Sequence, residues 1–152
     1  MKKEGFKWWE TTIACNRMQE DGANRQVKEH YLLRANSFTD AEKKSMKVAA
    51  ETAASDFTIA DLKERKYVDV FLSDSADDDN FYQVKVALIT LDEKSGKEKK
   101  TNLLYLQQAS SVVKAINLLD RNLNKEVMCN YVVLEVKQTN ILDVFDLDAL
   151  KD

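Results

Sequence analysis

The residue types that could carry out chemistry in this sequence are few and scattered. One histidine, His30, and two cysteines, Cys15 and Cys129, occur among 152 residues. A catalytic histidine needs a nucleophile beside it and a carboxylate that orients its ring, but the neighbouring Glu29 points to the opposite face of the predicted strand. One histidine and two cysteines cannot build an ordinary zinc site or a disulfide framework. We therefore predict no enzymatic activity, no metal site and no cofactor.

Aromatic rings and lysines form a more informative pattern. Sorting the predicted strands by the alternation of their side chains places six aromatic residues on the face that carries mainly polar residues. They are Trp8, Tyr31 and Phe57 in the first half of the chain and Phe81, Tyr105 and Tyr131 in the second half. Lys63 and Lys137 share that face. The opposite, apolar face is expected to pack against helices.

Two interpretations of the aromatic face remain open. In the first, rings beside lysines bind single-stranded nucleic acid. The residues assigned to this site are Trp8, Tyr31, Phe81 and Tyr105, which stack on bases, and Lys63, Lys137, Lys97, Lys99 and Lys100, which neutralise phosphates. In the second, the face is an interface, because aromatic patches of this size mark protein contacts. The chain would then be a protein–protein interaction module, either a virion or assembly component or an inhibitor of a host factor. A homodimer is compatible with the aromatic face.

These residues are positioned by an internal repeat. When the chain is shifted by 74 positions, residues 31–71 align with 105–145 without a gap, and nine of the 41 aligned positions are identical. The identities include Tyr31 with Tyr105 and Lys63 with Lys137, and the run Asp-Val-Phe occurs at 69–71 and again at 143–145. The sequence therefore predicts an internal duplication.

Each repeat is predicted to run strand, strand, helix, strand. The first two strands are expected at 7–17 and 27–35, and again at 81–91 and 100–108, each pair joined by a turn that contains a glycine. A helix is expected to begin after Ser37 and another near Ser110 or Ser111. Third strands follow at 57–65 and 130–138, each with a short extension that ends in Asp-Val-Phe. The predicted fold is α+β, with two ββαβ repeats, antiparallel-rich sheets and one helix per repeat.

Charge divides the chain into segments. The net charge is −3, so nothing draws the whole protein towards polyanions. We expect a single domain made of repeat one at 7–72, an exposed acidic linker at 73–80, repeat two at 81–145 and an acidic tail at 146–152. No apolar run approaches the ~18 residues of a membrane helix, and the N-terminus lacks the apolar segment of a signal peptide. We therefore expect no membrane association and a location in the cytoplasm of a bacterial host cell or in a virion.

Several motifs resemble one family over nearly the whole chain, from about residue 8 to residue 145. The motifs are Ser37-Phe38-Thr39-Asp40-Ala41-Glu42, the segment from Phe57 to Lys63, the segment Ile89 to Thr101, which begins ITLDEKSG, and the final Asp143-Val144-Phe145. They resemble an uncharacterised family of about 150 residues from Bacteroides-type bacteria and their crAss-like phages. The acidic linker and the C-terminal tail are longer than in that family. The resemblance implies a phage or mobile-element source and implies no mechanism.

Overall fold

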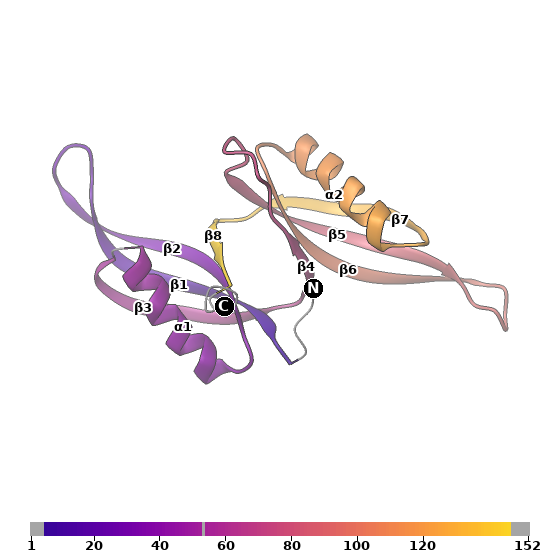
Figure 1. The fold of residues 1–152 in the computed structure, drawn as a ribbon, viewed down its shortest axis with the longest axis horizontal. Helices are drawn as coiled ribbons and strands as arrows, with labels where there is room; N and C mark the ends of the chain where they lie inside the picture. Colours follow the sequence, from indigo (N-terminus) through magenta and orange to yellow (C-terminus); the bar gives the residue numbers. More distant parts are fainter. Residues whose placement is uncertain (1–4, 53, 147–152) are drawn as a thin grey trace. The chain divides into compact units, whose positions relative to one another are not determined.

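The structure is a computed structural model that describes residues 5–52 and 54–146. Its elements follow one order twice along the chain (Figure 1). The first five are β1 (Lys7–Met18), β2 (Asn24–Ala35), α1 (Phe38–Glu51), β3 (Ser55–Arg65) and β4 (Tyr67–Phe71). The second five are β5 (Asn80–Leu91), β6 (Glu98–Ala109), α2 (Val112–Glu126), β7 (Asn130–Gln138) and β8 (Ile141–Phe145). The α+β class is confirmed, and each predicted strand overlaps an observed one.

The strands form two four-stranded sheets, β3-β1-β2-β8 and β4-β6-β5-β7. The orders correspond when the second is read in reverse, because β7, β5, β6 and β4 then take the places of β3, β1, β2 and β8. In the first sheet β1 pairs antiparallel with β2 and β3, and β8 runs parallel to β2. In the second sheet β5 pairs antiparallel with β6 and β7, and β4 runs parallel to β6. Both sheets are therefore mixed but rich in antiparallel pairs.

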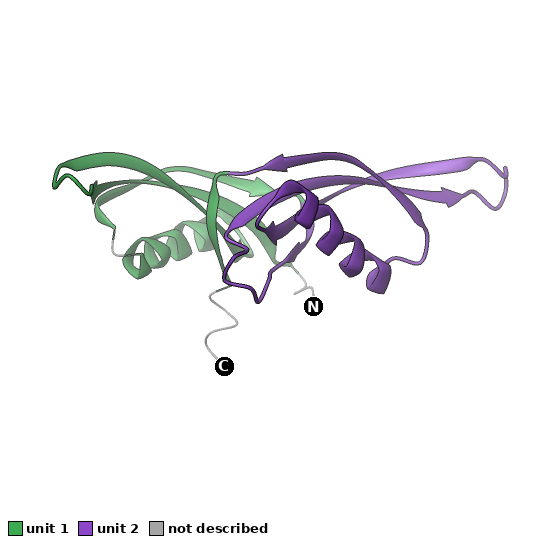
Figure 2. Cartoon of the chain, turned by 90° about the horizontal axis from the view of Figure 1, so that it is seen from above, with its two compact units in different colours: residues 1–66, 140–152 green, residues 67–139 purple. Residues whose placement is uncertain are grey.

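The two compact units of the chain differ from the two predicted sequence repeats. Unit 1 contains residues 1–66 and 140–152, and unit 2 contains residues 67–139 (Figure 2). The short strand that follows β3 therefore completes the sheet of unit 2, and the short strand that follows β7 completes the sheet of unit 1. The predicted Asp-Val-Phe extensions are strands, but each belongs to the other half's sheet.

Each helix begins at a serine cap and covers one face of the sheet in its own unit (Figure 1). The Ser37 Oγ accepts the N–H of Asp40 at 3.1 Å, and the Ser111 Oγ accepts the N–H of Lys114 at 3.2 Å. These bonds satisfy backbone donors that the first turn of a helix leaves without a partner. The predicted helix starts are confirmed.

The acidic segment 73–80 is more ordered than the predicted exposed linker. Asp78 is only 2% exposed, and its Oδ1 lies 2.6 Å from the Nζ of Lys114 on α2. Its Oδ2 accepts a hydrogen bond from the Ser73 hydroxyl, and its backbone carbonyl accepts one from Gln108 at 2.7 Å. The hydrogen bond from Lys114 holds the pKa of Asp78 below its usual range. The prediction of an exposed linker is wrong at Asp78, because a lysine on α2 compensates the burial of its charge. Of the predicted tail 146–152, only Asp146 lies within the described residues.

Candidate functional site

Two of the predicted aromatic site residues lie on the helix-free face of their sheets, as expected. Trp8 on β1 is half-buried, and the guanidinium of Arg34 lies 4.4 Å from the centre of its ring. Phe81 on β5 is 1% exposed. Trp8 therefore keeps some accessible ring surface, whereas Phe81 presents almost none.

Tyr31 and Tyr105 lie on the opposite face from the one predicted. Tyr31 pairs with Thr11, and Tyr105 pairs with Val84, so both rings share a face with the residues that pack under the helix. They are 6% and 3% exposed. Burial raises the pKa of both phenols, that of Tyr31 to about 12. The prediction that these two rings share a face with Trp8 and Phe81 is wrong.

Phe57 and Tyr131 also belong to the helix-side clusters rather than to the polar face. Phe57 packs with the cluster that contains Trp9, Ile13 and Tyr31, and Tyr131 packs with the cluster of the second sheet. Base stacking needs an accessible ring. Of the four rings predicted to stack on bases, only that of Trp8 is accessible.

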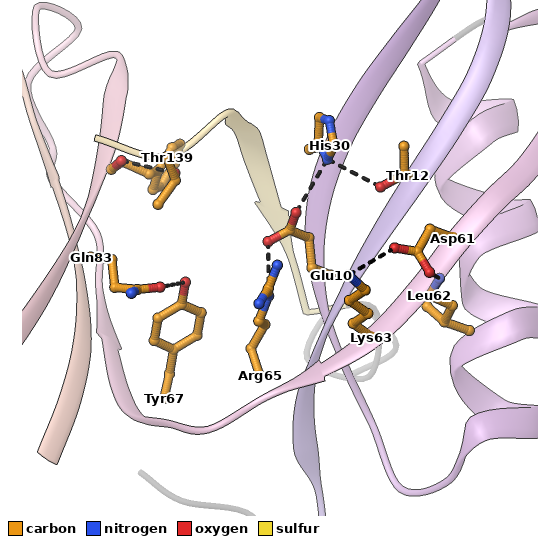
Figure 3. Close-up of polar contacts among 11 residues, drawn as sticks. Glu10, Thr12, His30, Asp61, Leu62, Lys63, Arg65, Tyr67, Gln83 and Thr139 are labelled. Carbon is orange, nitrogen blue, oxygen red and sulfur yellow. Dashed lines mark hydrogen bonds and ion pairs between the residues drawn. The ribbon is translucent and has the colours of Figure 1, made fainter. Parts of the chain in front are cut away.

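The predicted lysines are all exposed but do not form one patch. Lys63 pairs with Asp61 at 3.6 Å on β3 in unit 1 (Figure 3), while Lys137 lies on β7 in unit 2. The hairpin lysines Lys97, Lys99 and Lys100 lie in or beside the β5–β6 turn. Lys99 and Lys100 are consecutive strand residues, so their side chains point to opposite faces.

The single histidine belongs to a polar cluster that the sequence analysis did not foresee. On the helix-free face of unit 1, one Glu10 oxygen lies 3.2 Å from the Nδ1 of His30, and the other accepts the Nε–H of Arg65 at 3.1 Å (Figure 3). The Thr12 hydroxyl is 3.1 Å from the same His30 Nδ1. In a nucleophile–base–acid triad the hydroxyl and the carboxylate use different ring nitrogens, so this arrangement is not a triad. The cluster joins three strands of one sheet.

A second missed cluster lies on the helix side of unit 1. The Arg17 Nε and Nη2 donate to the two oxygens of Glu29 at 3.0 and 2.7 Å, and Nη1 donates to the Thr52 carbonyl at 2.9 Å. The Tyr31 hydroxyl donates to Glu29 at 3.0 Å. The hydrogen bonds from Arg17 lower the pKa of Glu29, while burial raises the pKa of the nearby Cys15 thiol. This is a satisfied structural ion pair.

Three consecutive accessible apolar side chains of unit 2 lie on one sheet edge. β7 pairs with β5 on one side, and no other described strand pairs with it on the other. Along it Val132, Val133 and Leu134 are 43%, 37% and 51% exposed. Strand pairing with β5 skips Leu134, which is therefore a bulge residue.

A cavity of about 500 Å³ opens at the start of this strand. Its lining includes Leu91, Met128 and Cys129, and Leu91 and Met128 are 70% and 98% exposed. A cavity of about 340 Å³ lies at the corresponding place in unit 1, but Asn16, Arg17 and Asp56 make its lining polar. The two units thus place different chemistry at matching positions.

The match to a family model covers residues 7–147 and describes a domain of unknown function, DUF4494. The chain belongs to the DUF4494 family. A search of curated proteins gives no match to this DUF4494 chain. Among the residues that the structure describes, no three histidine, cysteine or acidic side chains are grouped as metal ligands. No helix in the described part of the DUF4494 chain is long and apolar enough to cross a bilayer.

Proposed function

We propose that this DUF4494 protein is a non-enzymatic binding module, and that a protein partner docks on the β7 edge of unit 2. The observation that carries the proposal is the run Val132-Val133-Leu134 on an edge strand that pairs on one side only. Edge strands that avoid association usually carry charges or are covered. An apolar edge of this kind favours pairing with an extended segment of another chain.

The equivalent edge of unit 1 provides an internal comparison. β3 is the edge strand there, and its pairing with β1 skips Ala60 in the way that the pairing of β7 skips Leu134. At the positions that match Val132, Val133 and Leu134, β3 carries Thr58, Ile59 and Ala60. A strand with this bulge therefore folds without a large side chain at the bulge. The bulge therefore does not require the larger apolar surface of β7, which supports a role of that surface in binding.

The cavity beside β7 adds a means of recognition. An added strand that pairs with the first part of β7, before the bulge, ends close to the segment that contains Met128, which lines the cavity. Main-chain hydrogen bonds then supply affinity, and an apolar side chain in the cavity supplies specificity. The partner is therefore an extended protein segment with at least one large apolar residue.

Selection from a library of random extended peptides tests this proposal. Peptides that bind the full chain should lose about tenfold in affinity for the V132T/L134A variant, because the removed methyl groups contribute roughly 1.4 kcal/mol. This variant installs the residues that β3 carries, so its strand geometry has a precedent in the same chain. Met18→Thr is the matched control, since Met18 is 74% exposed in unit 1. Peptides that bind the V132T/L134A chain as tightly as the wild type would refute the β7 edge as the docking site.

Single-strand nucleic-acid binding is the second candidate, and it is supported by the exposed lysines and by Trp8. With three rings buried, this function would depend on phosphate contacts, each adding about 0.7 to the slope of log affinity against log salt on single strands. A fluorescence titration with a labelled strand of about 25 nucleotides at two salt concentrations separates the candidates. Binding that weakens steeply with salt and falls in Trp8→Ala supports nucleic acid. Binding no tighter than about millimolar at low salt would contradict nucleic acid as the ligand.

We also propose that the two units descend from one duplicated ββαβ repeat and that the source is a phage or a mobile element. The duplication is supported by the corresponding strand orders and by the two bulges at matching positions. The source is supported by the sequence motifs alone. Superposition of residues 31–66 on residues 105–140 tests the duplication. Matching backbones support it, and backbones that do not superpose contradict it.

A further inference from the structure

β4 and β8 are two copies of one kind of strand. Their sequences are Tyr-Val-Asp-Val-Phe and Ile-Leu-Asp-Val-Phe. Each runs parallel to the second strand of a hairpin, and each pairing shifts register after the first residue. The Asp, Val and Phe of both strands therefore meet equivalent positions of β2 and β6.

The side chains of the two strands also make matching contacts. The Val70 N–H donates to Asp69, and the Val144 N–H donates to Asp143, both at 2.8 Å. The Phe71 ring stacks 5.9 Å from Tyr105. The Phe145 ring lies 5.7 Å from Tyr31, in an edge arrangement. Each hairpin thus binds an Asp-Val-Phe strand at a backbone edge, with a tyrosine ring against the phenylalanine. We call this binding position the slot.

The slot in unit 1 is filled from a distant part of the sequence. β2 ends at Ala35, while β8 begins at Ile141, directly after the elements of unit 2. The backbone pairing and the ring contact described above involve only β2 and β8, so a strand from a second molecule would make the same contacts. Exchange of an identical element between protomers is a low-cost route to dimers.

β8 is the more readily exchanged of the two strands. Leu142 is 53% exposed and Asp143 is exposed, whereas every residue of β4 is half-buried or buried. Less burial means that less apolar surface meets water when the strand leaves. Segments of this kind open at lower free energy than the core.

We propose that the β2 edge is an exchangeable slot for an Asp-Val-Phe strand, and that its second occupant is β8 of another copy of this chain. The product is a strand-exchanged dimer. A short tether gives the chain's own strand an effective concentration in the millimolar range. Exchange therefore needs concentrated protein or prior opening of β8. The proposal does not depend on the β7 edge, because the contacts that define the slot are made by β2 and β8.

A labelled peptide of residues 139–146 tests the slot in the full chain. It should bind the Phe145→Ala chain, whose own strand docks poorly, and not the wild type, whose slot is filled. A peptide with alanine in place of phenylalanine should bind at least about tenfold more weakly. Leu142→Ala is the matched control, since it alters an exposed residue of the same strand and leaves the slot filled. Phe145→Leu replaces Phe145→Ala if the latter does not fold by circular dichroism.

Light scattering on the wild-type chain tests the second occupant. Protein concentrated to about millimolar, warmed below its melting temperature and cooled should contain a dimer fraction that the Phe145→Ala chain lacks. Absence of peptide binding to a folded Phe145 variant overturns the slot. Peptide binding without any wild-type dimer overturns the second copy as its occupant.

Discussion

Glu29→Gln tests whether the Arg17–Glu29 pair stabilises unit 1. Glutamine keeps the shape of the side chain but removes the charge that accepts two hydrogen bonds from Arg17. The two side chains are 27% and 16% exposed, so the guanidinium would stay largely inside the protein without a counter-charge. Breaking a buried pair costs about 3–5 kcal/mol. Partial exposure lowers the expected cost to about 2 kcal/mol.

The stability lost in Glu29→Gln is also expected to depend on pH. The pKa of Glu29 is lowered in the folded protein, mainly by the hydrogen bonds from Arg17. Its stabilising contribution is therefore complete above the unfolded pKa of about 4.3 and declines as the pH falls towards the folded value. The difference between wild type and Glu29→Gln should be full at neutral pH and should shrink below about pH 4.

Urea and thermal denaturation, each followed by tryptophan fluorescence, measure this effect in unit 1. Both tryptophans, Trp8 and Trp9, lie in unit 1. A loss of about 2 kcal/mol corresponds to a fall of about 4–8 °C in melting temperature for a chain of this size. Unfolding curves that coincide at pH 7, or a difference of equal size at pH 3, would refute the reasoning.

The second unit supplies the control. At the positions that match Arg17 and Glu29, it carries Thr90 and Leu103, and Leu103 pairs with Val86 as Glu29 pairs with Ile13. The double variant R17T/E29L copies this uncharged pair. Replacing a whole buried pair is often neutral or stabilising, so the double variant should lie within about 1 kcal/mol of wild type while Glu29→Gln does not.

Substitutions at Ser111 and Asp78 and a cut in the acidic segment 73–80 test other contacts of the described residues. Ser111→Ala should cost about 1 kcal/mol in thermal denaturation, because it removes the cap of α2; an unchanged melting temperature would contradict the cap. Asp78→Asn should lower the melting temperature, because it removes the charge that pairs with Lys114. The difference from wild type should shrink in acid, as the pH approaches the lowered pKa of Asp78. A difference that is constant from about pH 7 to about pH 2.5 would exclude the charge as its cause. Cleavage at a protease site introduced between Asp74 and Asp77 should leave the two fragments together on gel filtration, because each sheet contains a strand from the other fragment; fragments that separate in native buffer would contradict the strand order.

Local structure could be predicted from the sequence because its causes are local. Serine caps, glycine turns and β-branched runs fixed the element order, and Ser37 and Ser111 begin the helices as predicted. The face of β2 could not be predicted, because Tyr31, Leu32 and Leu33 are all buried and their pattern has no alternation. A register change of one residue moves every side chain to the other face. The assignment of Tyr31 and Tyr105 failed for this reason.

Contacts between distant segments were not visible in the sequence. Arg17 and Glu29 are twelve positions apart, and only the register of the β1–β2 hairpin brings them together. The repeated Asp-Val-Phe indicated two equivalent strands. Which sheet each strand joins depends on tertiary packing, and no local pattern encodes that choice.

The order of synthesis leaves the β2 edge of unit 1 uncovered while most of the chain is still being made. β2 is complete at residue 35, but the strand that covers its edge begins at residue 141. At about 5–20 residues per second, the ribosome needs roughly 5–20 s to make the intervening chain. During that time β2 presents an unpaired edge, which favours wrong pairing with other nascent chains. Unit 2, whose four strands are contiguous from residue 67 to 139, can fold before the sheet of unit 1 is complete. Wrong pairing during synthesis is therefore expected mainly in the first-synthesised half.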